Sequence, residues 1–175
     1  MADITFNTNA NETVAREFLI LYLNTGTQQA PTWSPLGKRV EDSSIEYDWQ
    51  KENRTDILGN NYALLKKPQM TQSFSAYPLD SADTAAVQIW NKAIKDHDIA
   101  ALAAMDVLLV HLYAGTAKTA MFAERYEAST ITPTSLGGEG GGDLNSEMEV
   151  DFGGIRTTGT AAIAQGVVTF TADAA

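Results

Sequence analysis

Polar and apolar residues alternate along a stretch in the first third of the chain. Ile45, Tyr47 and Trp49 project to one side of an extended segment, and the acids Glu46 and Asp48 project to the other. A period of two is typical of a strand with one covered face and one solvated face. The segment therefore predicts a half-buried strand whose outer face is acidic.

A long polar connection, 51–61, follows this strand and is rich in charge. A second extended run comes next and ends at Phe74. The pattern predicts two long antiparallel strands joined by a charged loop. Hairpin loops usually contain about two to five residues, so a connection of this length favours a functional role.

Further extended stretches surround this hairpin. They are rich in β-branched and aromatic residues, or they alternate in polarity, and turn residues separate them. We expect strands at 16–24, 106–113, 119–132, 147–152 and 161–171, with a glycine-rich loop at 136–145. In 147–152 the acids Glu147, Glu149 and Asp151 alternate with apolar residues, so the three acids share one face.

One helical pattern lies between 80 and 97. Its apolar residues recur every three or four positions and form a single stripe. The stripe consists of Ala82, Ala85, Ala86, Ile89, Trp90, Ala93 and Ile94. We expect Asp80 or Ser81 to cap the first turn and Trp90 to be buried against a sheet. The pattern does not decide whether 99–105 extends this helix or connects it to the next strand.

Runs of strands with one flanking amphipathic helix predict a mainly β fold, a sandwich or barrel with the helix packed on it. We expect one domain, 14–171, between an N-terminal arm, 1–13, and a short C-terminal tail, 172–175. The N-terminal arm is polar and aperiodic. It is therefore either a frayed terminus or a segment that orders against a neighbouring molecule.

The composition argues against several functions. The formal net charge is −10, with 12 Lys and Arg against 22 Asp and Glu, so the basic footprint of a nucleic-acid-binding protein is missing. There is no cysteine, which excludes disulfides, thiolate nucleophiles and cysteine-based zinc sites. The longest apolar run, 107–113, is too short to span a bilayer, and no membrane association is expected.

No catalytic, cofactor-binding or metal site is predicted, and the chain is not expected to be an enzyme. The two histidines, His97 and His111, lack the spacing of metal ligands. The segment 143–147 resembles the start of an EF-hand loop. However, the twelfth position of that loop would be Gly154, where a bidentate Glu is required.

Several sequence features resemble one protein family in their order and spacing. They are a Leu-Tyr-Leu-Asn strand, a Trp-x-x-x-Gly segment at 33–37, the acidic strand Glu-Asp-Ser-Ser-Ile-Glu-Tyr-Asp, a loop containing Asp56-Ile57-Leu58-Gly59, one helix, and a glycine-rich closing region. Taken together, they resemble the tail tube (major tail) proteins of tailed bacteriophages, especially phages of Gram-positive hosts. The resemblance covers most of the chain.

The resemblance implies a β-sandwich with a flanking helix that forms hexameric rings, stacked into the hollow tail tube of a virion. It also implies contacts with tape-measure, tail-terminator and baseplate or distal tail proteins, and assembly in the host bacterial cytoplasm. DNA would pass through the tube into the host without specific binding.

In such a tube, the loop after the acidic strand would reach the next ring, and acidic strand faces would line the lumen. The inter-ring candidates are Lys51, Glu52, Arg54, Asp56, Ile57, Leu58 and Gly59. The lumen-facing candidates are Glu46, Asp48, Glu147, Glu149 and Asp151.

Two alternatives stay open. The chain could be a β-sandwich module that binds a carbohydrate or a receptor, with Trp33, Tyr47 and Trp49 as its platform. Alternatively, it could be a tube subunit of a contractile tail or of a headless tailocin particle, because tubes of this kind serve all of these machines.

Overall fold

The computed structural model describes residues 3–174; Met1, Ala2 and Ala175, which belong to the expected terminal arm and tail, lie outside the described residues. Strands dominate, as the sequence predicts. The strands are β1 (Leu19–Asn24), β2 (Trp33–Pro35), β3 (Ser43–Asp48), β4 (Glu52–Thr55), β5 (Asn61–Leu64), β6 (Gln69–Pro78), β7 (Met105–Thr116), β8 (Ala120–Pro133), β9 (Asn145–Asp151), β10 (Arg156–Ala164) and β11 (Val167–Ala172). The helical segments are η1 (Arg16–Phe18), α1 (Thr84–Trp90), the π-helix η2 (Asn91–Lys95) and α2 (Ile99–Leu102).

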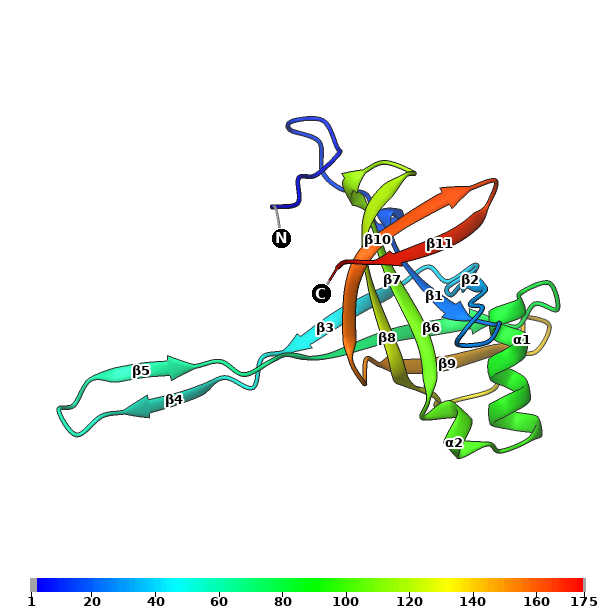
Figure 1. The fold of residues 1–175 in the computed structure, drawn as a ribbon. Helices are drawn as coiled ribbons and strands as arrows, with labels where there is room; N and C mark the ends of the chain where they lie inside the picture. Colours follow the sequence, from blue (N-terminus) through cyan, green and yellow to red (C-terminus); the bar gives the residue numbers. More distant parts are fainter. Residues whose placement is uncertain (1–2, 175) are drawn as a thin grey trace.

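The body of the molecule is built from two antiparallel sheets that share β8. One sheet has the order β2-β1-β7-β8-β10-β11, and the other has the order β8-β9-β6-β3. The first part of β8 pairs with β7 and β10, whereas residues 130–133 pair with β9. Because β8 passes from one sheet to the other, the strands of the two sheets cross steeply (Figure 1).

The core has two parts, one on each face of β7. Val107 and Leu109 pack between the two sheets, in a cluster that includes Val150 of β9. Leu108 and Val110 face the other way, into a cluster that includes Trp33. A strand that is buried on both faces loses the alternation of polar and apolar residues. This explains why β7 reads as a continuous apolar run.

The helix is shorter than its sequence pattern predicts. It begins at Thr84, and Asp83 caps it by accepting a hydrogen bond from the Ala86 amide (3.1 Å). The expectation that Asp80 or Ser81 forms the cap is therefore wrong. The Tyr77 hydroxyl donates a hydrogen bond to the second Asp83 oxygen (2.7 Å) and ties this cap to β6.

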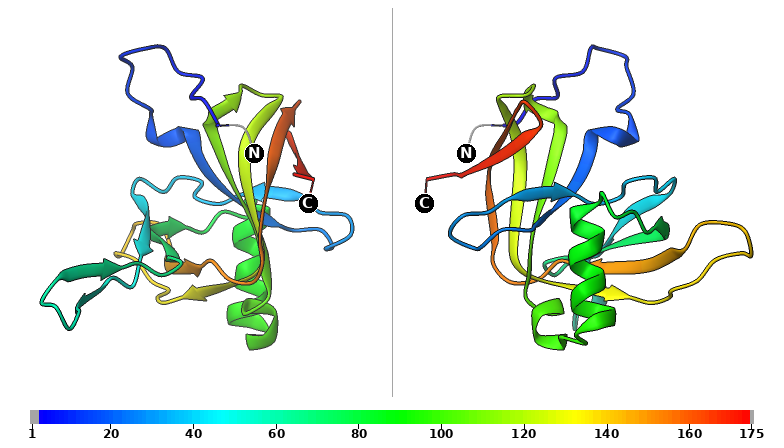
Figure 2. Two further views of the ribbon diagram at one scale, coloured as in Figure 1. Left: turned by 60° about the vertical axis from the view of Figure 1, so that its left-hand side comes forward. Right: turned by 90° about the vertical axis from the view of Figure 1, so that its right-hand side faces the viewer.

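Trp90 is 37% exposed, so the expectation of a buried Trp90 is also wrong. The helix lies at one end of the sandwich, beside the loop that joins β8 to β9, instead of across a sheet face (Figure 2). Only one side of it, with Ala85, Ala86 and Ile89, reaches the core. The open question about 99–105 is answered by the short helix α2, after which β7 begins at Met105.

The end of the chain also differs from the expectation. The single strand predicted at 161–171 is a hairpin of β10 and β11, joined by a turn at Gln165 and Gly166. Both turn residues have positive φ angles, 51° and 81°, which is the geometry of a two-residue hairpin turn. The turn was not predicted because the residues on both sides of it are apolar alanines and valines, so the segment has the pattern of one continuous strand.

The N-terminal segment, from residue 3 onward, contacts its own chain. The Asn7 amide donates to the carbonyl of Tyr113 (2.8 Å), and the Gly115 amide donates to the carbonyl of Thr5 (2.9 Å). The Phe6 ring also packs edge-on against Tyr113. This segment therefore adds a short piece of strand to the end of β7.

Candidate functional site: assembly surfaces

A long hairpin arm, residues 49–68, projects from the body between β3 and β6 (Figure 1). The expected loop at 51–61 is mostly a two-stranded ribbon in which β4 pairs with β5, from Glu52 opposite Leu64 to Thr55 opposite Asn61. A hydrogen bond from the Lys66 amide to the Trp49 carbonyl (3.1 Å) continues the ribbon toward the body. The arm is thus an ordered extension of the hairpin.

The tip of the arm is a tight turn built by Asp56. Its carboxylate accepts hydrogen bonds from the Leu58 amide (2.8 Å), the Asn60 amide (2.9 Å) and the Asn60 side chain (2.9 Å). The Asn60 contacts, aided by those from backbone amides, hold the pKa of Asp56 below its usual value. The turn leaves the side chains of Ile57 and Leu58 almost entirely in solvent, at 101% and 81% exposure.

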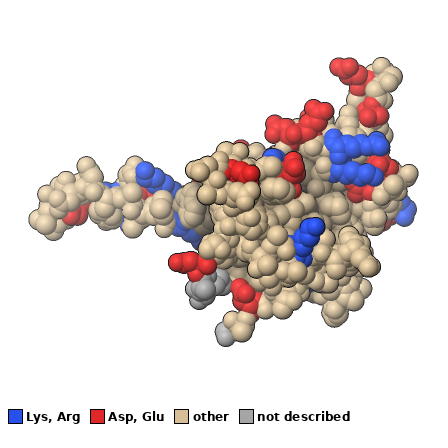
Figure 3. Space-filling model, turned by 90° about the horizontal axis from the view of Figure 1, so that it is seen from above, with Lys and Arg blue, Asp and Glu red and all other residues tan. Residues whose placement is uncertain are grey.

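The arm carries positive charge on an acidic molecule. Residues 49–68 contain four Lys or Arg and two acids, a net of +2, so the rest of the chain carries −12. Glu52 pairs with Arg54 (2.8 Å) and Lys66 (2.5 Å). Figure 3 shows basic side chains along the part of the arm nearest the body. The arm therefore differs in charge from the surface that it leaves.

The five acids predicted to line a lumen lie on one sheet face. In the register of the second sheet, Glu46 lies opposite Thr71, which lies opposite Asp151, and Ser73 lies opposite Glu149. All five acids are exposed. We call this surface, formed by Glu46, Asp48, Glu147, Glu149 and Asp151, the acidic face.

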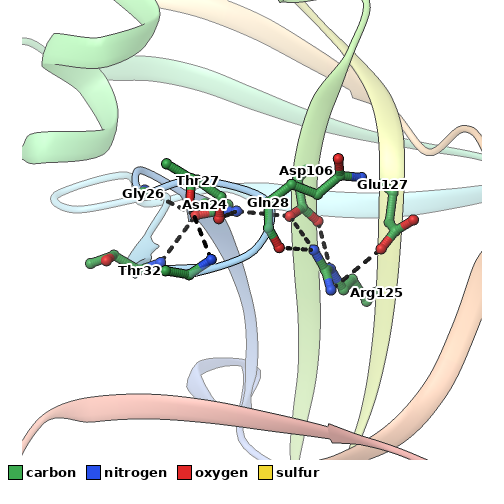
Figure 4. Close-up of polar contacts among 9 residues, drawn as sticks. Asn24, Gly26, Thr27, Gln28, Thr32, Asp106, Arg125 and Glu127 are labelled. Atoms are coloured by element: carbon green, nitrogen blue, oxygen red, sulfur yellow. Dashed lines mark hydrogen bonds and ion pairs between the residues drawn. The ribbon is translucent and has the colours of Figure 1, made fainter.

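A polar cluster that the sequence gave no reason to single out fastens the loop between β1 and β2 (Figure 4). The Arg125 guanidinium donates to both oxygens of Asp106 (2.9 and 2.8 Å), and the Asn24 amide group donates to the same carboxylate (2.8 Å). The Asn24 carbonyl oxygen accepts hydrogen bonds from the backbone amides of Gly26 and Thr32 (2.9 and 3.0 Å).

This cluster holds both ends of the loop in place. The hydrogen bonds to Asp106 raise the pKa of Arg125 above its usual value. Arg125 also lies over the Trp33 ring, 5.7 Å from its centre. Residues with this role come from three strands distant in sequence, so no local pattern could have indicated them.

A hollow of about 320 Å³ opens where the arm meets the body. Its wall includes Tyr47 and Trp49, whose rings stack 6.3 Å apart. Its floor contains the buried Glu124, which forms an ion pair with Arg156. Burial acts to raise the pKa of Glu124, but the contacts with His111 and Arg156 outweigh it and hold that pKa below its usual value.

The three-residue platform considered for a binding module is not formed. Trp33 is buried in the cluster beneath β1 and β7, and it is only 7% exposed. Tyr47 and Trp49 are about half exposed at the root of the arm, in the wall of the 320 Å³ hollow. The expectation that Trp33 shares a surface with Tyr47 and Trp49 is therefore wrong, because Trp33 lies on the opposite side of the first sheet from these two residues.

An apolar patch surrounds Trp90 at the end of the molecule that carries the helix. Its members are the partly exposed side chains of Leu79, Val87, Trp90, Ile94 and Leu136. A hollow of about 180 Å³ adjoins Trp90, and its lining includes Leu79 and Val87 together with the polar residues Asp80 and Ser81. We call this surface the Trp90 patch.

Among residues 3–174, no helix is both long and apolar enough to cross a membrane. In the same part of the chain, His, Asp and Glu side chains form no group of three or more suited to holding a metal ion. The described residues offer a set of surfaces: an exposed arm, an acidic face, an apolar patch and open strand edges at β2, β3 and β11.

No protein-family model and no curated protein sequence matches this chain. Among solved structures, the fold is similar to that of a chain described as a sheath/tube terminator of the extracellular contractile injection system PVC in its extended state. The TM-score is 0.53 at 9% identity, and the match covers 86% of this chain and 99% of that one.

Two further structures match with lower scores. One is described as the tube-terminating cap of the anti-feeding prophage (TM-score 0.43, 14% identity, covering 95% of this chain and 96% of that one). The other belongs to a PVC sheath-tube complex in the extended state (TM-score 0.41, 12% identity, covering 94% and 95%). At these identities, only the first match bears on this chain, and it bears on the fold alone.

Proposed function

We propose that this chain is a structural, non-enzymatic subunit of a phage-tail-like tube, in which six copies form a ring and rings stack around a hollow conduit. The observation that carries the proposal is the hairpin arm. It extends an ordered ribbon away from the body and ends in two aliphatic side chains, Ile57 and Leu58, that are exposed to water. Exposed apolar groups at the end of an ordered projection favour a protein–protein contact.

The open sheet edges support ring formation. Within the described residues, β3 and β11 each end a sheet with one side unpaired. An unpaired edge invites a further strand. Head-to-tail contacts between identical copies close such edges when the rotation between copies closes a ring.

The acidic face supports a role as the wall of the conduit. Its five carboxylates are exposed on one sheet face. Phosphates passing along such a wall meet no attractive site, so DNA would pass without binding. The screening length at physiological salt is about 8 Å, so this repulsion acts only close to the wall. Six copies at −10 give a ring of about −60, a charge that contacts between copies must overcome.

In this proposal the arm reaches the next ring, and Lys51 and Arg54 offset acids there. The partners are other copies of this chain, together with tape-measure, terminator and baseplate or distal tail proteins. The particle is a phage tail, a contractile tail or a headless tailocin, and it is assembled in the bacterial cytoplasm.

A second candidate is a ring that ends a tube, a terminator, instead of a ring that repeats along it. The specific observation that favours it is the similarity in fold to the sheath/tube terminator chain. A terminator would form single rings, whereas a tube subunit would form stacks of many rings.

The experiment is to concentrate the purified protein and to examine it by negative-stain electron microscopy and sedimentation velocity. We expect rings, with stacks if the chain is a tube subunit. Lys51→Glu with Arg54→Glu should prevent stacking and leave the melting temperature unchanged, because both side chains lie exposed on the arm. Lys118→Glu, in the turn between β7 and β8, is the control for a change of charge away from the arm.

A protein that stays monomeric at millimolar concentration would contradict the proposal. If that monomer also gained thermal stability with a saccharide, the binding-module alternative would replace it, with the hollow beside Tyr47 and Trp49 as the site. If the variant with Lys51→Glu and Arg54→Glu forms stacks as readily as the unmodified protein, the role assigned to Lys51 and Arg54 is wrong.

A further inference from the structure

The hollow at the root of the arm is enclosed by two parts of the chain. Tyr47, Trp49 and Lys67 line it from the end of β3 and from the arm. Glu124 of β8 and Arg156 of β10 line it from the body. Its volume of about 320 Å³ lies at the lower end of the range for small-molecule sites in proteins, about 300–1,000 Å³. The hollow therefore has the size of a site for a small ligand.

Aromatic rings form much of the lining. Tyr126 and Phe152 meet edge to face, with ring centres 5.0 Å apart. Tyr47 and Trp49 lie nearly parallel, with 17° between their ring planes, and they are 46% and 49% exposed. Half-exposed rings beside a hollow provide apolar faces on which another ring can pack. The lining therefore favours a ligand with an aromatic or similarly flat apolar body.

The charged side chains of the lining favour an anionic group on that ligand. The Glu124 carboxylate is buried, and Arg156 donates to it from Nε (2.9 Å) and from Nη2, so the acid already has a counter-ion. The Arg156 side chain is still 42% exposed. Lys67, also exposed, takes part in no ion pair among residues 3–174. The lining therefore has one cation in excess, and a carboxylate would form charge-assisted hydrogen bonds with both basic side chains.

The same groups disfavour two other classes of ligand. A cation would face Lys67 and the exposed side of Arg156, and like charges repel more strongly in a partly enclosed space than in water. A neutral saccharide needs partners for several hydroxyl groups, and each group left without one costs affinity. The acidic acceptor of the lining, Glu124, is already engaged. A ligand with a negative charge on an apolar ring avoids both problems.

We propose that the hollow at the root of the arm binds a small aromatic carboxylate. Its ring packs against Tyr47 and Trp49, and its carboxylate pairs with Lys67 and Arg156. The ligand bridges the arm and the body at a point beyond the last residue pair of β3 and β6, which joins Asp48 to Gln69. This inference goes beyond the proposed function, because it concerns a ligand of the single chain and not a contact between copies.

The test is an NMR titration of the full chain with phenylacetate, at a protein concentration below that at which copies assemble. A ligand of this size in a well-matched site binds with a Kd of about 1 mM. Three probes separate the features of the ligand: phenylacetamide lacks the charge, phenethylamine reverses it, and acetate lacks the ring. We expect each of them, and glucose, to bind at least about tenfold more weakly, because each loses one of the two matched features. Equal binding of phenylacetamide, phenethylamine or glucose would overturn the inference, as would no binding of phenylacetate at about 10 mM, tenfold above the expected Kd.

The three tryptophans of the chain report where the probe binds. The indole N–H signal of Trp49 should shift as phenylacetate is added, because Trp49 lines the hollow. The signals of Trp33, which is buried, and of Trp90, which lies beside the helix at the other end of the molecule, should not move. A shift at Trp90 without one at Trp49 would place the ligand elsewhere and refute the site.

Two neighbouring lysines provide a matched pair of variants. Lys67→Gln should weaken the binding of phenylacetate by about threefold, the effect of one exposed charge. Lys66→Gln, the control, should leave it unchanged, because Lys66 pairs with Glu52 on the ribbon and does not line the hollow. Equal effects of the two changes would show that the contact is unspecific and would count against the site.

The apolar contact is tested at Trp49. Trp49→Ala should weaken binding by about tenfold, and Trp49→Phe, which keeps a ring, should restore most of it. The melting temperature should change little in both variants, because the Trp49 side chain is half exposed. Unchanged affinity in Trp49→Ala would refute the packing of the ring. All of these measurements use dilute protein, so their failure would leave the proposed function intact, and a chain that does not assemble could still bind the ligand.

Discussion

Asp106→Asn tests whether the cluster around Arg125 holds the loop between β1 and β2. The Asp106 carboxylate accepts two hydrogen bonds from the Arg125 guanidinium and one from Asn24. An amide in its place keeps the shape of the side chain but turns one acceptor into a donor. That donor would face either the guanidinium or the Asn24 amide group, both of which are donors themselves. Arg125 would also lose its principal counter-ion.

The expected cost follows from the burial of the pair. The Arg125 and Asp106 side chains are only 15% and 10% exposed. Breaking a buried ion pair by removing one partner costs about 3–5 kcal/mol. The remaining contact with Glu127, at 3.3 Å, still offers Arg125 some compensation. We therefore expect a loss of about 3 kcal/mol, at the lower end of that range, in a domain whose total stability is of the order of 5–15 kcal/mol.

Equilibrium unfolding in urea measures this loss. Tryptophan fluorescence follows the transition, and Trp33, which lies under the guanidinium, is one of the three tryptophans that contribute to the signal. The midpoint should fall by about 1 M urea or more if the slope of the transition is unchanged. Glu127→Gln is the matched control, because this partner is 39% exposed and exposed ion pairs contribute about 1 kcal/mol or less.

The reasoning fails if Asp106→Asn costs no more than Glu127→Gln. A double-mutant cycle with Arg125→Met sharpens the test. The two changes should be strongly non-additive if the carboxylate and the guanidinium act as a unit. Additive losses would mean that loop 25–32 is held by other contacts.

Three further changes test other parts of the structure. Glu124→Gln should make the free energy of unfolding depend less on pH at acid pH. The pKa of Glu124 is lowered in the fold, so its carboxylate stabilises the fold above the unfolded pKa of about 4.3, and this stabilisation is lost as pH falls through the folded pKa. A pH dependence identical to that of the unmodified protein between pH 5 and pH 2 would contradict this. Gly159→Ala should destabilise by about 1–3 kcal/mol, because a Cβ there would overlap the Thr171 carbonyl oxygen and the Phe170 ring of β11; thermal unfolding measures the loss, and an unchanged melting temperature would show that β11 can shift. Tyr77→Phe should cost about 1–3 kcal/mol, because the buried Asp83 cap loses its hydroxyl donor, whereas Tyr62→Phe on the exposed arm, the control, should cost nearly nothing.

Several features were evident in the sequence because they depend only on neighbouring residues. The alternation of Glu46 and Asp48 with Ile45 and Tyr47 predicted β3 with an acidic outer face, which the structure contains. The expectation that Tyr47 and Trp49 are covered on the opposite face is wrong, because both are about half exposed and Trp49 lies beyond the end of β3. The apolar stripe after residue 80 predicted the helix, and the succession of strands predicted a mainly β fold. Periodicities of this kind reflect which side of an element faces water, and a linear sequence records that directly.

Other features were hidden because local pattern could not reveal them. Gln165 and Gly166 divide a run that reads as one strand, since the strands on both sides have the same composition. The apolar stripe overstated how much of the helix is buried, because Trp90 lies on the stripe but is 37% exposed. The sequence likewise grouped Trp33 with Trp49, although a sheet lies between them.

The class of fold, the acidic strands and the charged hairpin follow from sequence pattern alone. That the acids of β3 and β9 lie on one surface is evident only in the folded molecule, because it depends on the register of both strands against β6. Only the structure joined Asn24, Asp106 and Arg125, and only the structure placed the arm tip and the Trp90 patch at opposite ends of the molecule. Strand register and the crossing of the two sheets result from packing the whole chain at once, and no short stretch of sequence contains that information.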